Sequence, residues 1–147
     1  MEALLDTPAS DAPAPSPDEA TPITIKEKWQ GAVTQGSGFV AVPVALLRLQ
    51  SKYDLTPTDM LVLINLLAHW WDPARAVYPR STTIAKRMGV DKRTVQRATQ
   101  KLENAGLLSR DITEEGRRVF KFDRLVEKLA RDVPAAYVIQ AQETHGS

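Results

Sequence analysis

The sequence predicts a mostly α-helical domain with a small β-hairpin near its C-terminal end. Three observations lead to this fold class. Apolar residues recur at helical spacing over much of the chain, a glycine separates two short helical patterns between Ser81 and Leu108, and two short alternating runs then flank Gly116. With 147 residues, 43% of them hydrophobic and 6% aromatic, the chain suits one compact domain.

Residues 1–22 differ in composition from the rest of the chain. They contain five prolines and five acidic residues but no Lys or Arg. Such a segment cannot bury enough apolar surface to offset the entropy that is lost on ordering. We expect residues 1–22 to form a disordered, acidic, proline-rich arm, residues 23–133 to form the domain, and residues 134–147 to form a C-terminal tail.

The domain begins with an ambiguous segment and a short predicted helix. Within residues 23–42 the runs ITIKEKW and FVAV flank a glycine-rich stretch, so either short strands or an irregular arm would fit. Residues 43–51 predict a helix, because Pro43 suits its first turn. Three leucines would supply the apolar surface of that helix: Leu46, Leu47 and Leu49.

A better-marked helix begins at Thr56. Thr56 can cap it, Pro57 suits its first position, and Asp59 favours the positive end of its dipole. The run Leu61–Trp71 is nearly all apolar, so this helix should be the buried spine of the domain. The adjacent tryptophans at its end predict packing at the core and its edge, rather than a ligand site.

The two helical patterns that follow have the spacing of a helix-turn-helix. If Ala85 is counted as the fifth position, Gly89 falls at the ninth, where the turn needs φ > 0, and Val95 at the fifteenth, where the helices pack together. Asp91 can cap the second helix, and Gly106 can end it. The apolar residues of the second helix recur on one face: Val95, Ala98, Leu102 and Ala105.

The opposite face of the second helix carries side chains that can read base edges in a DNA major groove, where Arg forks onto guanine and Gln pairs with adenine. The candidate base-reading residues are Lys92, Arg93, Gln96, Arg97 and Gln100. Lys92 and Arg93 lie in the first turn, where the helix dipole disfavours cations by roughly 0.3–1 kcal/mol each. A docked phosphate or base edge would remove that penalty. The alternative interpretation is an ordinary surface helix with a solvated basic face.

The runs LLSRDI and RRVFKF predict a β-hairpin that turns at residues 113–116, with Gly116 in a left-handed conformation. One side of the hairpin would carry two sets of alternating residues, Leu108, Arg110 and Ile112 on the first strand and Arg118, Phe120 and Phe122 on the second. Arg117 and Arg118 near the tip could contact phosphate, whereas Glu114 and Glu115 would be repelled by it. A hairpin that only covers the core is the alternative.

With these residues in view, the chain resembles bacterial winged helix-turn-helix proteins over about Phe39 to Phe122. The matching residues are Phe39, Val42 and Pro43 at the start, Tyr78 and Pro79 before the motif, and Ile84, Ala85, Gly89, Val90, Thr94, Val95, Leu102, Glu103, Ala105, Gly106 and Leu107 within it. The family commonly has Ser directly after the Tyr-Pro pair, whereas this chain has Arg80. Its members include transcriptional regulators, phage and plasmid proteins, and the N-terminal domains of plasmid replication initiators.

The resemblance and the outward-facing cations together predict sequence-specific binding of duplex DNA, with transcriptional regulation as the preferred role. A replication-initiator or partition-like protein of a plasmid or phage is one alternative, and a protein-binding winged helix is another. We expect contacts to the DNA backbone from Ser81, Thr82, Thr83, Lys86, Arg87, Thr94, Lys101, Arg117 and Arg118.

Charge is distributed unevenly along the chain. Its net charge is +1, yet residues 1–22 carry −5 and residues 80–124 carry +6, which places the basic excess on the predicted DNA-binding segment. The chain has no cysteine, no apolar run of membrane-spanning length and no signal-peptide pattern, so we expect a soluble cytoplasmic protein. His69 has no partner at ligand spacing. We therefore expect no catalytic residue, no metal site and no cofactor.

A last helix should follow the hairpin, capped by Asp123 and interrupted or restarted at Pro134. Its apolar stripe would be formed by Leu125, Val126, Leu129 and Ala130. The run AAYVIQA, residues 135–141, is unusually apolar for a tail. It is the candidate contact of a homodimer, or else it folds back on its own domain.

Overall fold

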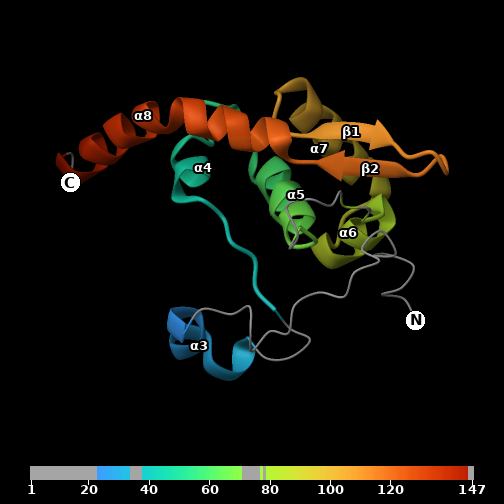
Figure 1. The fold of residues 1–147 in the computed structure, drawn as a ribbon, viewed down its shortest axis with the longest axis horizontal. Coiled ribbons are helices and arrows are strands. Elements are labelled where there is room, and N and C mark those ends of the chain that lie inside the picture. The colour runs from blue at the N-terminus through green and yellow to red at the C-terminus, as the bar shows by residue number, and fades with distance from the viewer. Residues whose placement is uncertain (1–22, 34–37, 71–76, 78, 146–147) are drawn as a thin grey trace.

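The computed structural model describes residues 23–33, 38–70, 77 and 79–145. The body of the domain consists of three helices, α5 (Pro57–Leu67), α6 (Ser81–Met88) and α7 (Lys92–Asn104), with an antiparallel hairpin beside them (Figure 1). The hairpin strands are β1 (Ser109–Ile112) and β2 (Arg118–Lys121). The described chain is therefore mostly helical with one small hairpin, which confirms the predicted fold class. The predicted acidic arm, Trp71 and Tyr78 lie outside the described residues.

The remaining helices flank this body. Helix α8 (Asp123–His145) packs along α4 (Val44–Arg48) and extends beyond the body at its C-terminal end (Figure 1). Helix α3 (Ile23–Trp29) and the short 3-10 turn η1 (Gln30–Ala32) lie apart from the body, and neither contains a buried residue. Residues 23–29 are thus helical, which corrects the alternative of a strand there. Their central Lys-Glu-Lys run consists of good helix formers.

Apolar side chains from α5, α6 and α7 meet in one core. Val95, Ala98 and Leu102 of α7 are buried, and Ala105 packs against the same cluster, so the predicted apolar face is confirmed. Trp70 packs on the ring of Phe122 with a centroid distance of 5.0 Å, as expected for a core residue.

The N-terminus of α5 forms a capping box. The Asp59 backbone N–H donates to Thr56 Oγ1 at 3.1 Å, and the Thr56 backbone N–H donates to the Asp59 carboxylate at 2.9 Å. The predicted cap is confirmed, and Pro57 occupies the first helical position. The helix ends at Leu67, earlier than the apolar run suggested, and Leu61 is 50% exposed. An unbroken apolar run therefore does not lie wholly inside the core.

Helix α4 is shorter than predicted. It spans Val44–Arg48 with Pro43 as its N-cap, and irregular turns follow it up to Asp54, whose φ of +57° reverses the chain before α5. Leu46 and Leu49, three residues apart, are fully buried. Leu47 is 44% exposed because it lies a quarter turn away from that buried face, so its predicted place in the apolar surface is wrong.

Helix α8 runs through Pro134 without a break, so the predicted interruption is wrong. Proline removes one intrahelical hydrogen bond, but contacts on both sides of it hold the helix in place. The Tyr53 hydroxyl donates to the Asp132 carboxylate at 2.7 Å, and Arg48 Nε lies 3.2 Å from Glu143 Oε2. Ala136, within the predicted tail, is buried against the core.

The hairpin is attached to the body through its base. Strand register pairs Ser109 with Lys121 and Ile112 with Arg118. On its free side, β2 exchanges two backbone hydrogen bonds with Val77, with Phe120 N–H donating at 2.8 Å and its carbonyl accepting at 3.0 Å. Gly116 has a φ of +81°, which confirms the left-handed turn. The hairpin does cover the core at its base, but Ile112 on its outer half is 65% exposed.

Candidate nucleic-acid interface

A tight turn fixes α7 against α6. Gly89 has a φ of +68°, and the backbone N–H of Val90 donates to the Ala85 carbonyl at 3.0 Å, which closes the C-terminus of α6 in a Schellman arrangement. Asp91 then caps α7, accepting from the Thr94 backbone N–H at 2.8 Å and from its hydroxyl at 2.7 Å. Both hydrogen bonds from Thr94 favour the charged carboxylate and lower the pKa of Asp91. The predicted turn and cap are confirmed.

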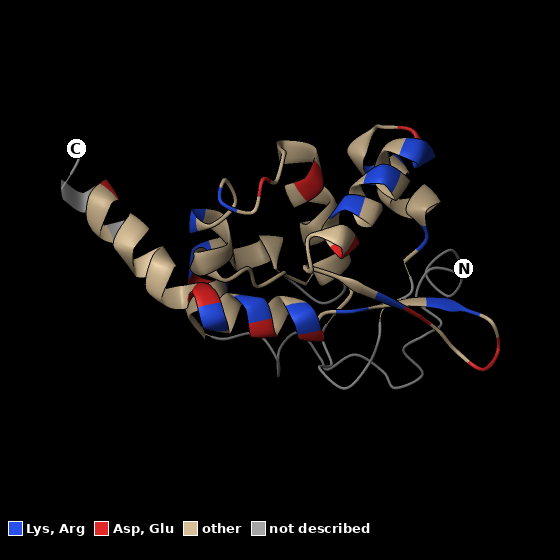
Figure 2. Ribbon diagram, turned by 90° about the horizontal axis from the view of Figure 1, so that it is seen from above, with Lys and Arg blue, Asp and Glu red and all other residues tan. Residues whose placement is uncertain are grey.

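The structure places all five candidate base-reading residues on the exposed surface of α7. Arg93, Gln96, Arg97 and Gln100 are spaced three and four residues apart and share one face, and Lys92 precedes them in the first turn. Gln100 Nε2 donates to Asn104 Oδ1 at 3.1 Å on the same face. Figure 2 shows cations along α7 and in the hairpin, whereas cations and acids alternate over the first half of α8. The roles of these residues toward DNA stay a prediction.

The predicted backbone contacts on α6 gather at its two ends. Ser81, Thr82 and Thr83 form its first turn, where the N-cap residue Arg80 provides no side-chain hydrogen bond to the helix. Lys86 and Arg87 are exposed in its last turn, and Arg87 Nη1 lies 3.1 Å from His69 Nε2. The family's serine would stand at this N-cap position, so its replacement leaves α6 without the usual cap.

The hairpin tip presents charges of both signs, as the sequence predicts. Glu114, Glu115, Arg117 and Arg118 are all exposed. The turn is closed by Thr113, whose backbone N–H donates to the Arg117 carbonyl at 2.9 Å and whose hydroxyl accepts from the Arg117 N–H at 3.1 Å.

Comparison with known proteins supports this arrangement. Residues 53–108 match a family model described as a helix-turn-helix domain. The described part of the chain thus has the fold of a winged helix-turn-helix. In this fold α7 is the recognition helix and the hairpin is the wing.

The chain is similar to several solved structures at low sequence identity, and the first of them has the same fold. The N-terminal domain of DnaD protein from Geobacillus kaustophilus aligns with a TM-score of 0.54 and 19% identity over 83% of this chain and 99% of that chain. A mutant of MepR from S. aureus, bound to an oligodeoxyribonucleotide, aligns with a TM-score of 0.45 and 21% identity over 71% of this chain and 72% of that one. The ST1889 protein from Sulfolobus tokodaii aligns with a TM-score of 0.47 and 20% identity, covering 71% and 96%. No curated protein sequence matches the chain.

Two further properties bear on other kinds of site. None of the described helices has the length and apolarity needed to cross a bilayer. Within the same described residues, no group of three His, Cys, Asp or Glu side chains is arranged to hold a metal ion.

Lys101 has an intramolecular partner that sequence reasoning missed. Its Nζ lies 2.7 Å from Asp59 Oδ2, so it joins the recognition helix to the cap of α5. Burial of the Asp59 carboxyl would raise its pKa, but hydrogen bonds from Lys101 and Thr56 outweigh burial and hold the pKa below its ordinary value. A phosphate contact by Lys101 would therefore compete with this ion pair. Thr94 is engaged similarly, because its hydroxyl donates to Asp91.

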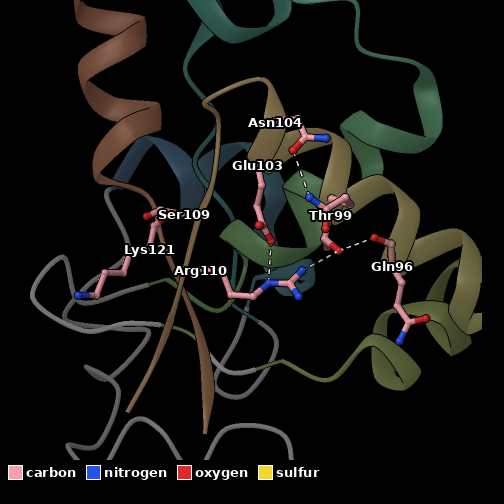
Figure 3. A network of polar contacts seen from close by, with 8 residues as sticks. Gln96, Thr99, Glu103, Asn104, Ser109, Arg110 and Lys121 are labelled. Carbon is pink, nitrogen blue, oxygen red and sulfur yellow. Dashed lines mark hydrogen bonds and ion pairs between the residues drawn. The ribbon is translucent and has the colours of Figure 1, made fainter. Parts of the chain in front are cut away.

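Arg110 of β1 is a second residue whose role the sequence did not reveal. Its Nε lies 2.6 Å from Glu103 Oε1, and its Nη2 lies 3.4 Å from Thr99 Oγ1 (Figure 3). Its guanidinium carbon lies 5.4 Å from the centre of the Phe120 ring. The strand pattern showed only an Arg between Leu108 and Ile112. An arginine at an inward-facing strand position, with a Glu on the preceding helix, is the signal that could have found this contact.

Proposed function

We propose that the protein binds duplex DNA sequence-specifically, with α7 in the major groove, and acts as a transcriptional regulator. The observation that supports this most strongly is the outward face of α7. Five cationic or amide side chains are exposed on a helix whose opposite face is buried and whose N-terminus is capped. Arg and Gln are the residues that pair bidentately with guanine and adenine.

The proposal also accounts for the position of the cations. Lys92 and Arg93 are exposed at the positive end of the helix dipole, which is unfavourable in isolation and favourable when that end approaches phosphates. Lys86 and Arg87, exposed at the end of α6, and Arg118 on the wing could contact the DNA backbone around such a docked helix. These contacts would be made in the cytoplasm of a bacterial cell.

The test is to sequence the genomic fragments that the purified full chain retains, and then to measure binding to the enriched site and to a scrambled duplex. Isolated sites at promoters would support regulation, whereas tandem repeats at an origin would indicate a replication role. Equal affinity for enriched and scrambled duplexes, with loss of both to random competitor DNA, would contradict sequence-specific readout. Absence of any DNA retention would favour a protein-binding winged helix.

We also propose that α8 mediates a homodimer. One face of α8, about a quarter turn from the core-facing side chains of Leu125, Leu129 and Ala136, is apolar at alternating spacings of four and three residues. It consists of Val126, Ala130, Val133 and Tyr137. Val126 is 51% exposed and Tyr137 is 65% exposed. That spacing is the one that seats a second helix in a coiled coil, and α8 of another copy matches it in length and pattern.

A dimer would place two recognition helices on one duplex. The DNA site of the dimer should then be a pseudo-palindrome whose half-sites lie about 10 base pairs apart from centre to centre, or a multiple of that distance. Tyr137→Glu should convert the dimer to a monomer in analytical ultracentrifugation, while Glu127→Gln, an exposed change on the same helix, should not. A wild-type protein that is monomeric when bound to its site would contradict the proposal.

A further inference from the structure

The wing and the recognition helix are joined by a polar network. Strand register and alternation place Arg110, Ile112, Arg118 and Phe120 on one face of the hairpin. Arg110 is the member of this face that reaches α7, where it meets Glu103 and Thr99, one helical turn apart (Figure 3). The outer members of the face, Ile112 and Arg118, are therefore turned to the same side of the wing as the recognition helix.

The contacting atoms of this network are shielded from solvent. The Arg110 Nε and Glu103 Oε1 atoms are both shielded from solvent, and they form a close ion pair without the alignment of a hydrogen bond. The guanidinium is also held over the Phe120 ring, a ring on the opposing strand of the same hairpin. Strand β2 is fixed on its other side by the backbone pairing with Val77. The base of the wing thus has a defined position on both of its edges.

The network ends at the backbone carbonyl of a candidate base-reading residue, Gln96. Thr99, which is buried, donates its hydroxyl hydrogen to the backbone carbonyl of Gln96 at 2.8 Å while Arg110 donates to the same hydroxyl. Gln96 lies three residues before Thr99, on the side of α7 nearest the wing. A shift of Arg110 would therefore move the wing relative to Gln96.

We propose that Arg110 is a positioning residue that holds the wing at a fixed angle to the recognition helix, so that Arg118 and Gln96 meet one duplex in a single geometry. This inference rests on the proposed DNA binding. Partly buried ion pairs add little net stability over apolar pairs but can fix one arrangement among several. Arg110 thereby specifies where the wing lies, and an apolar residue at this position would cover the core without specifying that angle.

The hairpin supplies a matched control. Lys121 forms an ion pair of 3.2 Å with Asp111, within the wing itself. Lys121→Met and Arg110→Met each remove one cation and one ion pair from the hairpin, but only the second breaks the contacts with Glu103 and Thr99 of α7. We expect Arg110→Met to weaken specific DNA binding about tenfold more than Lys121→Met, which is within the range for coupled neighbours.

A salt titration distinguishes positioning from simple destabilisation. In the wild-type chain, Arg118→Ala should reduce the slope of log K against log salt concentration by about 1, as expected for one lost phosphate contact. In the Arg110→Met background, Arg118→Ala should leave the slope unaltered, because the wing no longer presents Arg118 to the DNA phosphates. Equal effects of Arg118→Ala in both backgrounds would overturn the proposal.

Two measurements separate loss of the positioning role from misfolding of the variant and from failure of the proposed DNA binding. The double variant Glu103→Leu with Arg110→Met replaces the ion pair by an apolar pair and should keep the wild-type unfolding midpoint while still losing the Arg118 effect. Residual dipolar couplings of the hairpin amides, measured without DNA, should change relative to α7 in Arg110→Met but not in Lys121→Met. Unchanged couplings in Arg110→Met would refute the positioning role even if the protein binds no DNA.

Discussion

The Asp59 carboxylate should be worth more to stability than any exposed acid of this domain, because it caps α5 and pairs with Lys101 at once. Its side chain is only 7% exposed, whereas that of Lys101 is 39% exposed. Asp59→Asn keeps an oxygen that can accept from the Thr56 N–H but loses the charge. Hydrogen bonds to charged groups contribute about 1.5–3 kcal/mol, and the exposed lysine can return to solvent, so we expect a loss of about 1–2 kcal/mol. Asp59→Ala also removes the cap and should cost about 1 kcal/mol more.

The pH dependence of this loss gives a second check. Because the pKa of Asp59 is lower in the folded chain than in the unfolded chain, its contribution is fully present above the unfolded pKa, about 4. That contribution disappears as the pH falls through the lower, folded pKa. The stability difference between wild type and Asp59→Asn should therefore be constant between about pH 5 and 7 and shrink below about pH 4.

Urea denaturation followed by circular dichroism at a series of pH values measures both quantities. Glu127→Gln, an exposed change on α8, is the control and should stay within about 0.5 kcal/mol of wild type. The reasoning fails if Asp59→Asn is as stable as the control at neutral pH, or if its deficit does not diminish in acid.

Three further predictions concern the interface and the N-terminal arm. Arg97→Ala should weaken specific binding by about 1–3 kcal/mol and relax base preference at one or two positions, and an equal loss on a scrambled duplex would reassign Arg97 to a phosphate contact. Arg80→Ser should raise the free energy of unfolding by about 0.5–2 kcal/mol, because serine can form a new N-cap on α6. An unchanged midpoint of urea denaturation would contradict this prediction. Removing the acidic residues 1–22 should tighten nonspecific DNA binding several-fold at low salt and hardly at all at high salt, and identical affinities across a titration would identify the arm as inert.

Local signals predicted the helix-turn-helix well, because each acts within a few residues. Thr56, Gly89 and Asp91 perform the capping or turning roles that their residue types and spacing indicate. The burial of Val95 and Leu102 follows from helical periodicity in the same way. These features need no information about distant parts of the chain.

The features that the sequence did not reveal depend on tertiary contacts. Pro134 predicts a break in isolation, but contacts of α8 with Tyr53 and Arg48, far away in sequence, accompany a continuous helix. Similarly, Lys101 and Arg110 looked like surface cations until the structure placed a carboxylate beside each. Which cation meets DNA and which meets an acid is decided by the packing of helices and strands, which periodicity alone does not specify.

The Asp91 cap alters the electrostatic environment of the two cations that follow it at the N-terminus of α7. Lys92 and Arg93 oppose the helix dipole, and the sequence analysis indicated that a docked phosphate or base edge would remove this penalty. In the folded chain the Asp91 carboxylate stands at the same end of α7, and nearby Arg97 and Arg93 help to lower its pKa after the larger effect of the Thr94 hydrogen bonds. The penalty on the recognition helix is thus partly compensated without DNA, while the cationic side chains stay exposed. Dipole relief can then contribute only part of the binding energy, and the pairing of Arg and Gln with base edges has to supply the specificity.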